Sequence, residues 1–241
     1  MKHHLALALT LTIAPLANAA LININFTGFT GGNQGPTEEA DISGPAGGLG
    51  TTWNQYNNED TSGTVLDSSG AATSIQVTTN FSEGRYDGGG PTLPIYRATL
   101  TDFGRGVNSR NVTISGLDAG GLYDIWLMSL RSQGADAERL VGWWSTGSTT
   151  TSSSDQFYDN RISPTINNST FVAGENYVLF ENVEADGSGQ IIFNGVAGTE
   201  LDGSDDTYRQ GLNGLQINLV PEPGSLALLG LGGLLVLRRR R

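Results

Sequence analysis

The chain has 241 residues, a formal net charge of −11 and no cysteine. Without cysteine no disulfide can form, so a folded domain must be stabilised by a hydrophobic core. Between residues 20 and 219 there are 8 Arg, no Lys and 23 Asp and Glu, and this excess of negative charge disfavours nucleic acid and anionic lipid headgroups as partners.

Residues 1–19 are predicted to be a secretory signal peptide. A short basic start precedes an apolar run from Leu5 to Leu16, and Ala17 and Ala19 supply the small side chains that signal peptidase requires. The alternative is a buried N-terminal helix, which would not explain this order of features. We therefore expect the Sec translocon and signal peptidase to be partners, and cleavage to follow Ala19.

Removal of the signal peptide limits the chemistry of the mature protein. His3 and His4 are the only histidines, so residues 20–219 contain no His, Lys or Cys. Ser-His-Asp and Cys-His nucleophiles, His-ligated metals and lysine Schiff bases are thereby excluded. We expect a protein that is not an enzyme, although paired carboxylates could still serve a glycan hydrolase.

Residues 20–219 are predicted to form one all-β domain, a jelly-roll-like β-sandwich. Short runs alternate between apolar and polar residues, and Gly, Asn, Asp or Ser separates them, which is typical of a sandwich or barrel. We expect a signal helix before this domain and a hydrophobic helix after it. The predicted strands lie at 22–26, 64–68, 75–77, 94–100, 112–114, 122–130, 139–144, 176–183, 190–196 and 215–220.

Two of the intervening segments are rich in small residues. Residues 30–50 are predicted to be a long irregular connection, and residues 145–155 to be a Ser/Thr-rich loop that is exposed to solvent and is a candidate for O-linked modification.

Tryptophans beside amide side chains suggest a carbohydrate site, because an aromatic ring stacks on a sugar while amides and carboxylates bind its hydroxyls. The candidates are Trp53 with Asn54 and Tyr56, and the neighbouring pair Trp143 and Trp144, of which one is expected to be in the core. The alternative for Trp53 is a ring that covers one end of the core. Trp126 alternates with Met128 and is predicted to be a core residue.

Asp202, Asp205 and Asp206 lie within five residues of one another and could offer oxygen ligands to calcium. The simpler interpretation is an acidic turn without metal, because Asp and Gly are common turn residues. A structural calcium ion is therefore kept as the alternative to a domain without a cofactor.

The last 22 residues form the most specific motif of the chain. Pro221, Glu222 and Pro223 precede an apolar segment at 225–237 and the basic cluster Arg238, Arg239, Arg240 and Arg241. This order resembles the sorting signal of PEP-CTERM proteins. The resemblance implies export by a Gram-negative bacterium, transient anchoring in the inner membrane with the arginines on the cytoplasmic side, and cleavage by exosortase, a membrane-embedded cysteine protease.

Three segments of the core resemble galactose-binding-like and malectin-like jelly rolls. They are SGLDAGGLYDIWLMSL at 115–130, NYVLFENVEADGSGQIIFNGV at 176–196, expected to be a hairpin, and GLNGLQINL at 211–219. This resemblance implies a β-sandwich and transfers no sugar-binding residue.

Together these features predict an exported, non-catalytic protein of the cell surface or extracellular matrix that binds carbohydrate, with exopolysaccharide as the expected ligand. The alternatives are a purely structural, glycosylated matrix protein and a carboxylate-based glycan hydrolase.

Overall fold

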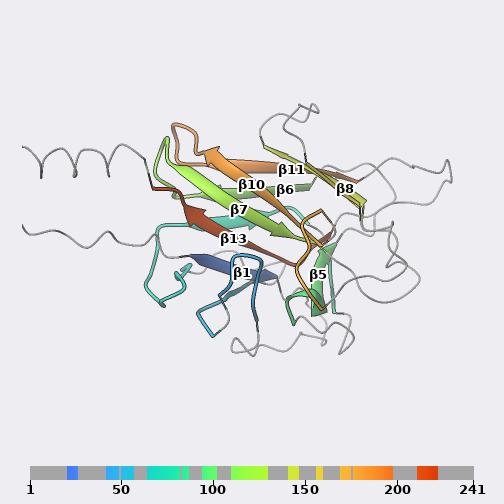
Figure 1. Cartoon of the computed structure of the whole chain (residues 1–241). Helices are drawn as coiled ribbons and strands as arrows, with labels where there is room; N and C mark the ends of the chain where they lie inside the picture. The colour runs from blue at the N-terminus through green and yellow to red at the C-terminus, as the bar shows by residue number, and fades with distance from the viewer. Residues whose placement is uncertain are drawn as a thin grey trace, which may run out of the picture.

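A computed structural model describes residues 21–26, 42–48, 50–56, 64–81, 83–86, 94–101, 110–129, 141–146, 156–159, 169–174, 176–197 and 211–221. The described part consists of strands and one 3-10 helix (Figure 1). The strands are β1 Ile22–Phe26, β2 Asn54–Tyr56, β3 Gln76–Thr79, β4 Glu83–Tyr86, β5 Ala98–Thr101, β6 Arg110–Ser115, β7 Leu122–Met128, β8 Val141–Thr146, β9 Gln156–Asp159, β10 Tyr177–Glu184, β11 Ile191–Ala197, β12 Gly211–Leu212 and β13 Gly214–Leu219, and the 3-10 helix η2 spans Pro94–Arg97.

Two five-stranded sheets form the domain, and the all-β prediction is confirmed. The first sheet has the order β10-β7-β13-β1-β2 and the second the order β3-β6-β11-β8-β9. A small third sheet has the order β12-β5-β4. In the first sheet only β1 and β2 are parallel, and β13 pairs with both β7 and β1. The last strand of the domain is therefore central rather than an edge strand.

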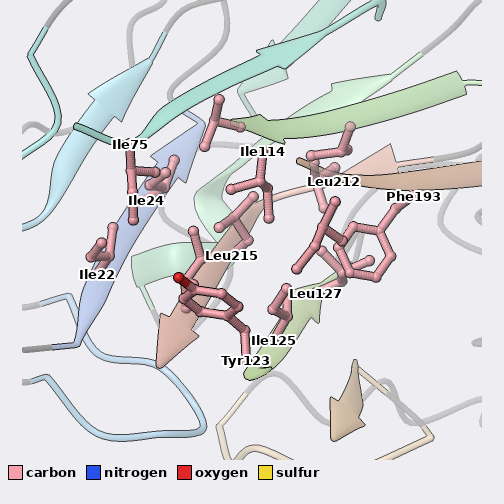
Figure 2. Close-up of a cluster of buried hydrophobic side chains, with 14 of the residues drawn as sticks. Ile22, Ile24, Ile75, Ile114, Tyr123, Ile125, Leu127, Phe193, Leu212 and Leu215 are labelled. Atoms are coloured by element: carbon pink, nitrogen blue, oxygen red, sulfur yellow. The ribbon is translucent and has the colours of Figure 1, made fainter. Parts of the chain in front are cut away.

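The main core lies between the two large sheets and is made by alternate residues of their strands (Figure 2). Ile125 and Leu127 of the first sheet and Ile114 of the second are fully buried. The rings of Phe180 and Phe193, one from each sheet, are tilted at 55° with centroids 4.9 Å apart. Each fully buried aliphatic side chain stabilises the folded state by about 1.5–3 kcal/mol because it leaves water. The core can therefore stabilise the domain without disulfides.

The described hydrophobic core begins at Ile22 and ends at Ile217. Every buried hydrophobic residue in the described part lies between Ile22 and Ile217. The predicted signal helix, the predicted C-terminal helix and the cleavage position after Ala19 lie outside the described residues. The domain limits at residues 20 and 219 therefore stay predictions.

Three details of the predicted strands were wrong. Residues 176–196 do not form a hairpin, because β10 pairs with β7 in the first sheet while β11 pairs with β6 and β8 in the second. The 185–190 turn thus connects the two sheets. Residues 64–68 form only the isolated bridge Leu66–Ala72, and the segment predicted at 94–100 begins as the 3-10 helix η2.

The connections between the sheets depend on glycine at two positions. Gly116 and Gly189 have φ of 76° and 70°, in the left-handed region that favours glycine. A Cβ at either position would also overlap a backbone carbonyl, that of Ser74 or that of Leu117. Both turns therefore pack too closely for any other residue.

Candidate functional site

The outer face of the first sheet carries a half-buried tryptophan, Trp126. Tyr123, Ile125 and Leu127 of β7 point into the main core, so Asp124 and Trp126 lie on the opposite face. The prediction of Trp126 as a core residue was therefore wrong. In the sequence, Asp124 indicated that Trp126 lies on the outer face, because residues i and i+2 of a strand share a face.

Cross-strand neighbours surround Trp126 with both apolar and polar groups. Leu179 of β10 and Gln216 of β13 stand directly opposite it, and Asn218 stands opposite Asp124. Residues directly opposite in an antiparallel pair point to the same face. Trp126, Leu179, Asp124 and Asn218 are all half-buried, and we call these four residues the Trp126 platform. Figure 1 shows its strands β10, β7 and β13 side by side.

A bulge in β10 holds one side of the platform. The register between β10 and β7 shifts between Phe180 and Val183, so that two residues, Glu181 and Asn182, oppose Asp124. Asn182 has a φ of 54°, and its backbone N–H donates to Oδ1 of Asp124 at 2.9 Å. Bulges commonly re-aim a side chain at a functional site, and here the bulge fixes the Asp124 carboxylate beside Trp126.

The loop at residues 42–53 covers the sheet on the other side of the platform. Gln216 is fully buried, and its amide donates to Oδ1 of Asn23 (2.7 Å) and to the carbonyl of Gly47 (3.1 Å). Its Oε1 accepts from the N–H of Ala46 (2.9 Å). A Cβ at Gly44 would overlap the Gln216 amide, so glycine lets the loop approach this closely. We call these contacts the Gln216 latch.

A second hydrophobic cluster closes the end of the same face. Met128 of β7 packs there with Ile42, Trp53 and Ile95, and Phe171 and Tyr177 cover the cluster. The outer face of the first sheet is therefore buried around Met128 and partly open around Trp126. The Trp126 platform therefore keeps partial exposure to solvent.

Trp53, which we predicted to stack on a sugar, is 1 % exposed within the second cluster. Its indole N–H donates to the carbonyl of Gly48 at 3.0 Å. The structure thus has the alternative arrangement, in which Trp53 covers buried side chains, and its ring offers no open face to a ligand.

Asn54 and Tyr56, the predicted companions of Trp53, also make internal contacts. The Asn54 amide donates to the carbonyls of Asn23 and Leu66 and accepts from the N–H of Leu66. Tyr56 is 4 % exposed and contacts Phe26, with ring centroids 6.3 Å apart. Both residues therefore lie outside the candidate site.

Trp143 and Trp144 lie in β8, one opposite Val196 and the other opposite Gly195 of β11. Their part in ligand binding stays a prediction.

The predicted calcium ligands and most of the sorting signal lie outside the described residues. These are Asp202, Asp205, Asp206, Ala17, Ala19, Glu222, Pro223 and Arg238–Arg241, whereas Pro221 is described and exposed. Within the described ranges, no three or more acidic, His or Cys side chains are grouped to hold a metal ion. Among the helices of those same ranges, none is long and apolar enough to cross a membrane.

A comparison with protein families identifies the C-terminal signal. The model of the PEP-CTERM protein-sorting motif matches residues 219–241, which confirms the predicted resemblance of the C-terminal segment to this sorting signal. The roles of Pro221, Glu222 and Pro223 in recognition stay predictions. The chain is therefore an exported protein whose C-terminal membrane anchor is cleaved by exosortase. No curated protein matches the chain.

Among solved structures, the chain is similar to extracellular domains of plant receptors. The ANX2 ectodomain of Arabidopsis thaliana is 17 % identical with a TM-score of 0.46, and the match covers 84 % of this chain and 51 % of that one. The ANXUR1 extracellular domain of the same plant is 12 % identical with a TM-score of 0.49, and the match covers 83 % and 49 %. The chain thus spans about half the length of these proteins.

Proposed function

We propose that the exported protein binds carbohydrate without catalysis, and that the Trp126 platform is the binding site. The observation that carries this proposal is a half-buried indole beside a fixed carboxylate and an amide on the partly open outer face of the first sheet. An aromatic ring supplies the apolar surface on which a pyranose stacks, and Asp124 and Asn218 supply hydrogen-bonding groups for its hydroxyls.

The charge of the platform favours neutral sugars. Asp124 belongs to it, and the exposed Glu181 lies directly beside it in the bulge. Uronic acids and other anionic sugars would be repelled by these carboxylates, as nucleic acid would be by the charge of the whole domain. We therefore propose a neutral hexose polymer as the ligand, in the exopolysaccharide of a Gram-negative biofilm matrix.

The test is binding of neutral and acidic polysaccharides to residues 20–220, a fragment that keeps the whole described core and the hydrogen bond from Val220 to Leu122. Trp126→Ala should weaken binding by about 30-fold, because truncating an aromatic residue at the centre of an interface costs roughly 2 kcal/mol. Ile192→Ala is the matched control, since Ile192 is 38 % exposed on the second sheet.

Three results would contradict the proposal. Absence of binding to any polysaccharide would favour the structural, glycosylated matrix protein. Equal losses for Trp126→Ala and Ile192→Ala would move the site away from the platform. Turnover of a polysaccharide that is abolished by Asp124→Asn would make the protein a glycan hydrolase. The structural calcium ion at Asp202, Asp205 and Asp206 stays a separate prediction.

A further inference from the structure

Both ends of the domain leave the sandwich at the same place. β1 begins at Ile22, which pairs with Ile217 near the end of β13. The segment predicted to be cut by signal peptidase and the segment cut by exosortase are therefore attached to neighbouring strand ends.

Three turns surround these strand ends. The N–H of Ser68 donates to the carbonyl of Leu21, and the N–H of Val220 donates to that of Leu122, both at 2.8 Å. Next to Leu122, the N–H of Ala185 donates to the carbonyl of Gly121 at 2.9 Å. We call the turns 67–70, 117–121 and 185–189 the exit pole, and Ala119 and Ser188 are exposed on it.

The sorting motif follows the fold without a linker. Val220 is still hydrogen-bonded to β7, and the next residue, Pro221, is the first of the Pro-Glu-Pro triplet. Even fully extended, Pro221–Pro223 reaches no further than about 10 Å from the pole, at 3.3–3.6 Å per residue. A protease that binds this motif on a folded domain must therefore approach the pole itself.

We infer that the exit pole docks against the membrane-embedded sorting protease while the anchor is being cleaved. The inference rests on the sorting motif and is independent of carbohydrate binding. A protein surface fits better than lipid headgroups, because the turns and their flanks carry Asp67, Asp118, Glu184 and Asp186, with no Lys or Arg in 67–70, 117–121 or 184–190. Anionic headgroups would repel such a surface.

The lack of cysteine in the chain makes the inference testable by site-specific crosslinking. The full chain is produced with Ala119→Cys in a host whose exosortase has lost its nucleophilic cysteine, so that the complex persists. A short photoreactive maleimide on this cysteine should yield a crosslink to the protease. Ala173→Cys is the matched control, because Ala173 is an exposed alanine at the opposite end of the sheet, about seven residues of β7 or roughly 20 Å away.

The crosslink should be strong for Ala119→Cys and lost for Ala173→Cys. Ser188→Cys, on the adjacent turn, should give the same crosslink as Ala119→Cys. Agreement between the two turns shows that the crosslink does not arise from local misfolding at one substituted residue. A Gly-Ser spacer of about ten residues between Val220 and Pro221, with a mean span of roughly 17 Å, should abolish the crosslink from the pole. Crosslinks to lipid alone, or equal crosslinks from both ends of the domain, would overturn the inference whether or not the protein binds sugar.

Discussion

Replacement of Gln216 by methionine should open the loop at residues 42–53 by removing the Gln216 latch. Methionine has a similar volume and no hydrogen-bonding amide, so the substitution removes polar contacts and adds little strain. The side chain is fully buried, and water therefore cannot replace its partners without rearrangement of the loop.

The cost follows from the three hydrogen bonds that Gln216 makes. Its partners are Oδ1 of Asn23, the carbonyl of Gly47 and the N–H of Ala46, at 2.7, 3.1 and 2.9 Å. At about 0.5–1.5 kcal/mol for each bond, the free energy of unfolding should fall by roughly 3 kcal/mol. Asn23 cannot compensate by rotating its amide, because its Nδ2 already donates to Oγ1 of Thr51 and to the carbonyl of Thr52.

Urea and thermal unfolding of residues 20–220 measure this loss. A fall of roughly 3 kcal/mol in a domain of this size lowers Tm by about 6–12 °C. Gln76→Met is the matched control, because Gln76 is a half-buried glutamine in strand β3. If Gln216→Met and Gln76→Met unfold at the same urea concentration, the latch does not hold the loop and the reasoning fails.

Substitutions at two further positions test the surroundings of the platform and the pole. Tyr123→Phe removes the phenol oxygen that accepts the N–H of Asp118 at 2.9 Å, and it should cost about 1 kcal/mol in thermal unfolding. Burial raises the pKa of Tyr123, so the stability that its neutral phenol contributes is present below the ordinary tyrosine pKa and is lost as pH rises through the raised one. In a pH titration, the part of the phenolate absorbance that Tyr123→Phe removes should therefore appear only above the ordinary tyrosine pKa. Asn182→Ala should lower stability by about 1 kcal/mol because of the left-handed φ, whereas Asn182→Gly should be tolerated, and a greater loss with glycine would contradict this account of the bulge.

Alternation along the chain was enough to predict most of the strands. The apolar residues of ININF, NVTIS and LQINLV have a period of two, and β1, β6 and β13 follow it. Alternation does not say which strands pair. The parallel contact of β1 with β2, and the separation of β10 and β11 into different sheets, arise from contacts between residues far apart in the sequence.

The candidate site was harder to predict because both faces of the first sheet are partly apolar. In LYDIWLM, core residues and outer residues are both large and hydrophobic, so only Asp124 indicates which face is open. The prediction that Trp53 binds a sugar failed for a different reason. Its polar neighbours suggested a binding loop, but the Asn54 amide donates to the carbonyls of Asn23 and Leu66, and the Trp53 indole donates to that of Gly48.

The proposed binding of neutral carbohydrate at Trp126 is tested most directly by the indole N–H signals of the four tryptophans. Residues 20–220 are titrated with the neutral polysaccharide and followed by nitrogen–proton NMR. The indole signal of Trp126 should shift as polysaccharide is added and stop shifting when the site is saturated, whereas the signal of the buried Trp53 should not move. Shifts confined to Trp143 or Trp144, or no shift of any indole in a solution where binding is detected independently, would contradict the account.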